Sequence, residues 1–124
     1  MRLLLDTNAL LWWRDDSPRL SGRANDQIRD PDNAIVISVA SLWEIAIKRG
    51  LGKLRFPGDF EEMMTEDEFD LLGITYAHLR ALDDLPQHHR DPFDRLLIAQ
   101  ALAERIPIAT ADRHFAAYGV QIIW

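Results

Sequence analysis

The stretch Arg2-Leu3-Leu4-Leu5-Asp6 is a short apolar run that ends on a carboxylate, and it decides how the rest of the chain is interpreted. A second apolar run, residues 106–110, leads through Ala111 into Asp112 in the same way. Continuous apolar runs of this length are typical of buried strands in a parallel sheet. The carboxyl ends of such strands meet at one edge, where α/β proteins bind ligands. We therefore expect these two acids, from opposite ends of the sequence, to lie close together.

Strands and helices alternate along the chain in the order of βαβ units. Strands are predicted over residues 1–5, 34–37, 70–74, 106–110 and 120–124. Helices are predicted around residues 10–13 and over 21–29, 41–49 (or from 38), 59–65, 75–85 and 92–105. This order predicts one domain over residues 1–124, an α/β fold with a mainly parallel central sheet in a three-layer α/β/α sandwich.

The composition is that of a folded domain with no cysteine chemistry. Apolar residues make up 48% of the 124 residues and charged residues 27%. The absence of cysteine excludes disulfides, thiolate zinc sites and cysteine nucleophiles. No apolar run approaches the length of a membrane span, and the first residues lack the pattern of a signal peptide. We expect a cytoplasmic protein with no membrane partner.

Two further acids lie near the starts of strongly patterned helices. Glu44 has apolar residues on both sides, and a buried carboxylate requires a partner or an ion. Asp94 shares a helical face with Leu97 and Ile98, which points it inward. Asp91, followed by proline, is expected to cap that helix or to act as an auxiliary acid.

Each of these acids also has a purely structural interpretation. Asp6 and Asp112 suit helix N-caps, while Glu44 could form a capping box with Ser41 and an ion pair with Lys48. Four carboxylates that converge at one sheet edge, however, repel one another unless a cation lies among them. Oxygen ligands without cysteine or paired histidines favour Mg²⁺ or Mn²⁺ over zinc.

Polar neighbours are expected to support these acids. We expect Thr7 and Asn8 to orient Asp6, and Thr110 to hydrogen-bond a neighbouring carboxylate. His88 and His89 could assist proton transfer, although a surface loop is the preferred interpretation for both.

The charge of the chain does not decide its partner. The net charge is −6, which disfavours nucleic acid, but neutralising the four candidate ligands alone leaves −2. Twelve of the fourteen basic residues are arginines, which bind phosphate bidentately. Four basic residues without an intervening acid follow Glu44, and they form either a solvated loop or a contact for an RNA backbone: Lys48, Arg49, Lys53 and Arg55.

Four motifs in this order resemble the PIN domain, and more narrowly the VapC-type toxins of type II toxin–antitoxin pairs. The motifs are Leu3-Leu4-Leu5-Asp6-Thr7-Asn8, Ser41-Leu42-Trp43-Glu44-Ile45, Asp91-Pro92-Phe93-Asp94-Arg95-Leu96-Leu97-Ile98-Ala99 and Thr110-Ala111-Asp112. The resemblance covers nearly the whole chain. It implies a metal-dependent ribonuclease, usually a homodimer, that a small antitoxin inhibits.

The resemblance also assigns roles to individual residues. The acidic quartet of the family falls on Asp6, Glu44, Asp94 and Asp112, its asparagine on Asn8 and its Ser/Thr on Thr110. These proteins often carry an arginine directly before the last acid. Here Ala111 stands at that position and Arg113 follows the acid. Arg95 and Arg113 join the candidate RNA contacts.

Other functions fit the residues less well. A phosphoryl-transfer enzyme of the haloacid dehalogenase type needs a second aspartate where Asn8 stands, and a response-regulator receiver needs a lysine later than Lys53. The serious alternative is a catalytically inactive PIN-like binding module whose acids only cap helices. Hydrolysis at phosphorus does not require the 2′-hydroxyl, so DNA stays open as a substrate.

Overall fold

The computed structural model describes residues 1–124 and contains one five-stranded sheet. The strands are β1 (Arg2–Leu5), β2 (Ala34–Ser38), β3 (Asp70–Leu72), β4 (Ile108–Ala109) and β5 (Ile122–Ile123). Their spatial order is β3-β2-β1-β4-β5, and every neighbouring pair is parallel. The predicted α/β fold is confirmed, with a sheet that is wholly rather than mainly parallel.

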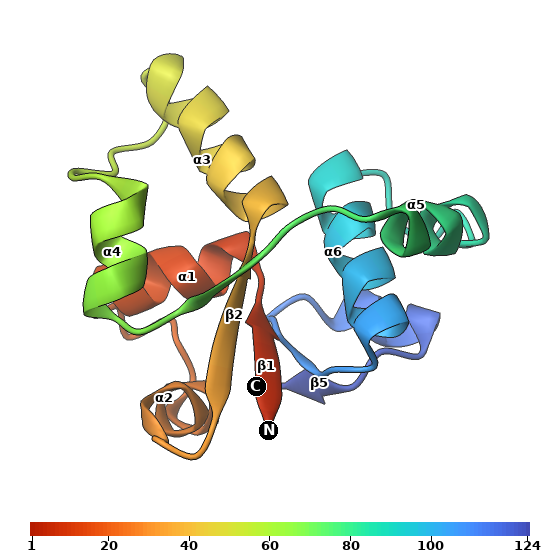
Figure 1. Cartoon of the computed structure of the whole chain (residues 1–124), viewed down its shortest axis with the longest axis horizontal. Helices are drawn as coiled ribbons and strands as arrows, with labels where there is room; N and C mark the ends of the chain where they lie inside the picture. The colour runs from red at the N-terminus through yellow and green to blue at the C-terminus, as the bar shows by residue number, and fades with distance from the viewer.

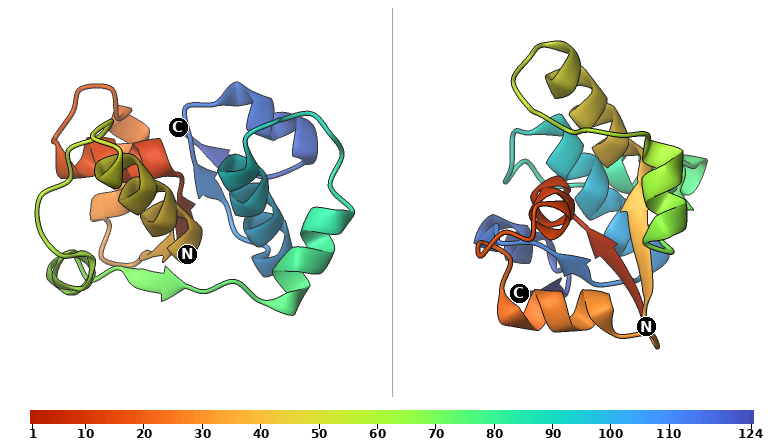
Figure 2. Two further views of the ribbon diagram at one scale, coloured as in Figure 1. Left: turned by 90° about the horizontal axis from the view of Figure 1, so that it is seen from above. Right: turned by 90° about the vertical axis from the view of Figure 1, so that its left-hand side faces the viewer.

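Helices cover both faces of this sheet (Figures 1 and 2). The helices are α1 (Thr7–Arg14), α2 (Gly22–Arg29), α3 (Val39–Gly50), α4 (Phe60–Glu66), α5 (Tyr76–Asp83), α6 (Pro92–Glu104) and the 3₁₀ helix η1 (Arg113–Tyr118). Helices α1 to α4 pack on one face, and α5, α6 and η1 pack on the other. None of the helices meets the length and hydropathy that a membrane span requires.

Alternate residues of the central strands supply two separate hydrophobic cores. Leu3 and Leu5 of β1 join the core beneath α1 to α4, and Leu4 between them joins the core beneath α6 and η1. All three are completely buried, and burial of each leucine contributes about 2 kcal/mol. Because both faces are covered, β1 is apolar and buried from Leu3 to Leu5. The first polar side chain after β1 is Asp6, at the carboxyl edge.

The start of α3 differs from the predicted capping box. Ser38, the last residue of β2, is the N-cap and its hydroxyl accepts a hydrogen bond from the Ala40 N–H. Ser41 lies inside the first turn, so the predicted box between Ser41 and Glu44 is wrong. The helix is also less buried than its composition indicates, because Trp43 is 58% exposed.

Candidate metal centre

Three strand ends and the start of one helix bring the predicted acids to the carboxyl edge of the sheet. Asp6 directly follows β1, and Asp112 follows β4 after a two-residue connection. Glu44 lies in α3, which begins directly after β2, and Asp94 lies in the first turn of α6. β1 lies between β2 and β4 in the sheet, so the carboxyl ends of these three strands are neighbours.

Asp6 caps a helix and is also a buried carboxylate among other acids. Its side chain accepts a hydrogen bond of 2.7 Å from the Ala9 N–H as the N-cap of α1, and the residue is 6% exposed. Burial raises the pKa of the Asp6 carboxyl from 3.8 to about 6, against hydrogen bonds from the Thr110 hydroxyl and the Ala9 N–H. The charges of Asp112 and Glu44 raise this pKa further. Asp6 therefore has the capping role that the structural interpretation predicts, and its carboxyl also lies near other acids.

Glu44 is buried and both of its oxygens have partners. The Thr7 hydroxyl donates to Oε1 at 2.7 Å, and Lys48 Nζ donates to Oε2 at 2.7 Å. The predicted ion pair with Lys48 is present. Thr7, which was expected to orient Asp6, hydrogen-bonds Glu44 instead. Asn8, the other residue expected to orient Asp6, has an exposed side chain.

Asp91 caps α6, as the sequence predicts, and Asp94 lies beside it in the first turn. Asp91 is the N-cap of α6 and accepts hydrogen bonds from the Phe93 and Asp94 N–H groups, at 2.8 and 3.1 Å. Burial raises the pKa of the Asp94 carboxyl from 3.8 to about 7, and the charge of Asp91 is the second cause. Weaker contributions come from the charges of Asp6 and Glu44.

The pKa of Asp112 is shifted in the opposite direction to those of Asp6 and Asp94. Burial alone would raise its pKa, but hydrogen bonds from His114 and His89 outweigh that effect and lower it. It is the N-cap of η1, a role also predicted, and accepts the His114 N–H at 2.9 Å. Its own N–H donates to the Thr110 hydroxyl at 3.0 Å. Since Thr110 also hydrogen-bonds Asp6, it connects two of the four acids, as predicted for a neighbouring carboxylate.

The four predicted acids thus lie close enough to perturb one another. The charge of Asp6 acts on Asp94, and those of Glu44 and Asp112 act on Asp6. Two of the carboxyls have pKa values raised toward neutrality, because their charged forms are poorly solvated and lie near like charges. Hard oxygen donors in this electrostatic setting fit a divalent cation such as Mg²⁺ or Mn²⁺.

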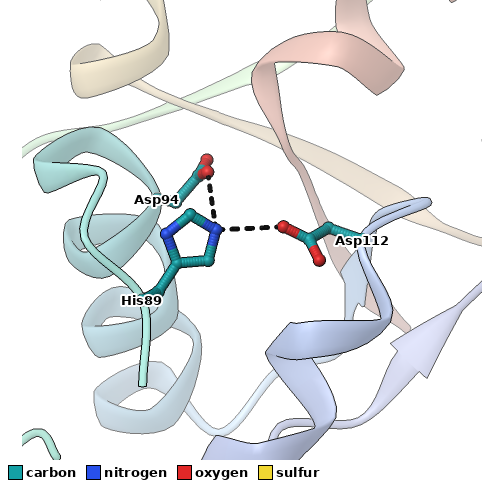
Figure 3. A group of neighbouring side chains, drawn as sticks. All are labelled: His89, Asp94 and Asp112. Carbon is teal, nitrogen blue, oxygen red and sulfur yellow. Dashed lines mark hydrogen bonds and ion pairs between the residues drawn. The ribbon is translucent and has the colours of Figure 1, made fainter. Parts of the chain in front are cut away.

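His89 belongs to this site, contrary to the expectation of a surface loop. Its Nε2 lies 3.0 Å from Asp112 Oδ2 and 3.3 Å from Asp94 Oδ2, and its side chain is only 18% exposed (Figure 3). Figure 3 shows the ring between the two carboxylates, which come from separate segments. The one sequence feature that could have indicated this is the position of His89 two residues before Asp91, the cap of α6. His88, next to it, is exposed as expected.

The six candidate RNA contacts fall into two groups. Lys48 is bonded to Glu44, and Arg49 donates to the carbonyls of Phe56 and Gly58. Arg95 donates to the carbonyls of Pro86 and Leu85, in the segment that leads to His89. The other three are exposed: Lys53, Arg55 and Arg113.

Comparison with known proteins gives one family and a group of similar structures. The family model of the PIN domain matches residues 3–121. No curated protein matches the sequence.

Solved structures of similar fold include VapBC2 from Rickettsia felis, bound to a DNA fragment from their promoter. It has 16% identity and a TM-score of 0.68, over 98% of this chain and 97% of that chain. FitAcB from Neisseria gonorrhoeae has 17% identity and a TM-score of 0.64, over 98% and 96%. A toxin–antitoxin complex from Klebsiella pneumoniae has 20% identity and a TM-score of 0.65, over 98% and 96%. At these identities the likeness is one of fold.

Proposed function

The chain belongs to the PIN-domain family, and from this premise we propose that it is a Mg²⁺- or Mn²⁺-dependent endoribonuclease that hydrolyses RNA phosphodiester bonds. We propose further that residues 1–124 form a single nuclease domain, which is the toxin of a type II toxin–antitoxin pair and acts on RNA in the cytoplasm. PIN domains are generally metal-dependent nucleases, which supports the reaction class.

One observation carries this proposal. Acids from four separate segments meet at the carboxyl edge of the sheet, and two of them have pKa values raised to about 6 and about 7. A set of helix caps would not need to share one location. A cation among these carboxylates would relieve both the desolvation and the repulsion.

In the proposed centre, Asp6, Glu44, Asp94 and Asp112 hold the ion or ions. A bound divalent ion supplies Lewis acidity, which makes water a better nucleophile and stabilises charge on the phosphate. The protein holds the carboxylates in place: Thr7 orients Glu44, and Thr110 connects Asp6 to the residue preceding η1. None of the four carboxylates needs to attack phosphorus.

Exposed basic residues provide the proposed contacts to the RNA backbone. Lys53, Arg55 and Arg113 are exposed and have charges available for phosphate. Lys48, Arg49 and Arg95 remain candidates, although each also binds groups of the protein itself. Ions bound at the acidic centre would lower the local negative charge that otherwise repels RNA.

We propose an antitoxin and a second copy of the chain as protein partners. Support comes from the structures of similar fold, which include a complex described as toxin–antitoxin. The catalytically inactive PIN-like binding module is the alternative. Metal binding separates the two, because a working centre should bind Mg²⁺ or Mn²⁺ and lose that binding in Asp94→Asn, whereas a purely capping role predicts no specific binding in either protein.

The test of function is cleavage of a pool of structured and single-stranded RNA by the purified protein, with Mg²⁺, Mn²⁺ or EDTA. Asp6→Asn is the matched control, since asparagine also serves as an N-cap. We expect cuts that require metal and disappear in the variant. Cleavage that persists in EDTA or in Asp6→Asn would overturn the assignment. A parallel DNA pool shows whether the 2′-hydroxyl is required.

A further inference from the structure

His89 contacts two of the proposed ligands through a single ring nitrogen, and its surroundings define what it can do. We propose that His89 is a positioning residue of the metal centre, whose Nε2–H hydrogen-bonds Asp112 and whose ring lies against Asp94, so that it holds the two acids together without binding the ion itself. This inference rests on the proposed metal centre. It concerns a residue outside the acidic quartet.

The ring of His89 is held in place by the segment that follows β4. The His89 N–H donates a hydrogen bond to the Tyr118 hydroxyl, and the imidazole packs edge-on against Phe115, with 5.9 Å between ring centres. Phe115 is completely buried and Tyr118 is 9% exposed. Arg95 fixes the preceding turn through the Pro86 carbonyl at 2.8 Å. The short segment from Pro86 to His89 is therefore anchored at both of its ends.

The hydrogen bonds of the ring determine which nitrogen carries the proton. The Asp91 N–H lies 3.1 Å from Nδ1, and a backbone N–H is always a donor. Nδ1 is consequently the acceptor, and in the neutral ring the hydrogen lies on Nε2. On the other side Nε2 faces only carboxylate oxygens, at 3.0 Å on Asp112 and 3.3 Å on Asp94. All the neighbours of the ring agree on this tautomer.

This tautomer excludes the two more obvious roles for a histidine beside an acidic site. A metal ligand or a general base needs a lone pair on Nε2, and that would move the proton to Nδ1. Nδ1–H would then face the Asp91 N–H, donor against donor, at 3.1 Å. What remains is donation from Nε2–H to Asp112, with Asp94 in contact with the same nitrogen.

Such donation has a specific consequence for the site. Asp94 comes from the first turn of α6 and Asp112 from the start of η1, and the ring that hydrogen-bonds Asp112 and contacts Asp94 fixes the distance between these two segments. His89 contacts the Oδ2 atom of each residue, so Asp94 Oδ1 stays available to a cation. Partners of this kind outside the ligand set typically change metal affinity by about 10–100-fold.

His114 is a useful contrast because it also contacts Asp112. Its Nδ1 lies 2.9 Å from Asp112 Oδ1, but its side chain is 84% exposed and it does not reach Asp94. It therefore cannot hold the two segments together in the way that His89 does.

The test combines the tautomer of His89 with metal affinity, using the full chain. Nitrogen NMR of the imidazoles shows which nitrogen is protonated, first in metal-free protein and then with saturating Mg²⁺. We expect protonated Nε2 and unprotonated Nδ1 in both states. A proton that moves to Nδ1 when Mg²⁺ is added would make His89 a ligand and overturn the proposal.

Mn²⁺ binding by electron paramagnetic resonance then tests the consequence in three variants. We expect His89→Ala to weaken binding by about 10–100-fold. His89→Gln, whose amide N–H can reach the place of Nε2, should restore much of it. The control is Gln87→Ala, which removes an exposed side chain of the same segment and should bind like the wild type.

Two results separate failure of this inference from failure of the proposed function. Wild-type affinity in His89→Ala, with circular dichroism unchanged, would overturn the positioning role and leave the metal centre intact. A wild-type protein that binds neither Mn²⁺ nor Mg²⁺ would overturn the centre itself, and the role of His89 with it.

Discussion

Replacement of Asp6 by asparagine should stabilise the metal-free protein while it abolishes metal binding. The pKa of this buried carboxyl is raised from 3.8 to about 6, mainly by burial. Each pH unit by which a pKa rises corresponds to about 1.4 kcal/mol, so the ionised carboxylate costs the folded state about 3 kcal/mol. Asparagine keeps an oxygen that can accept the Ala9 N–H, and it carries no charge.

The pH dependence follows from the direction of this pKa. Below about pH 4 the carboxyl is protonated in both the folded and the unfolded chain, and the wild type has no penalty. Between about pH 4 and pH 6 the unfolded chain loses its proton before the folded chain, so the wild type loses stability as the pH rises. Above pH 6 the penalty is complete, and the advantage of Asp6→Asn should be at its maximum.

The assay is urea unfolding followed by tryptophan fluorescence, at one protein concentration, from pH 8 down to pH 4 in EDTA. We expect Asp6→Asn to exceed the wild type in free energy of unfolding by about 3 kcal/mol at pH 8, with the difference shrinking toward pH 4. Saturating Mg²⁺ should stabilise only the wild type. A variant that is equally or less stable than the wild type at pH 8 in EDTA would refute the electrostatic reasoning.

Two further substitutions test contacts around the site and in the core. Thr7→Val removes the 2.7 Å hydrogen bond to buried Glu44, so the free energy of unfolding in urea should fall by about 1–3 kcal/mol. Unchanged stability together with unchanged Mn²⁺ affinity would contradict the role of Thr7 in holding Glu44. Glu104→Gln should remove the part of the pH dependence that Glu104 contributes at acid pH. The hydrogen bond from His78 lowers the pKa of Glu104, so the stability it gives is present above about pH 4.5 and is lost as the pH falls through the lowered pKa. The melting temperature of each protein is measured from pH 7 to pH 3. Equal changes of melting temperature with pH in wild type and Glu104→Gln would contradict this prediction.

The backbone of the site was predictable because local patterns decide it. The leucine run of β1 is buried on both faces, and the chain has to turn at Asp6 where the apolar run ends. The helical period placed Asp94 inward, and Pro92 after Asp91 marked the start of α6, as observed. These features depend on residues within one turn or one strand of each other.

The contacts between segments were less accessible from sequence. Thr7 was assigned to its neighbour Asp6, but it faces Glu44 because α1 and α3 pack side by side on the sheet. His89 looked like a loop residue because its partners, Tyr118 and Phe115, lie more than twenty residues away in sequence. The choice between Ser38 and Ser41 as the cap of α3 depends on where β2 ends. The pairing of β2 with β1 and β3 decides that end, and it cannot be deduced from the local sequence.

The central claim is that a divalent ion held by these four carboxylates acts on the scissile phosphate. Its most direct test is cleavage of an RNA in which sulfur replaces one non-bridging oxygen at the cut site, compared with the unmodified RNA. Mg²⁺ prefers oxygen ligands, whereas Mn²⁺ tolerates softer ones. We predict that sulfur slows cleavage strongly in Mg²⁺ and that Mn²⁺ restores much of the rate. An equal effect of sulfur in both metals would contradict direct action of the ion on the phosphate.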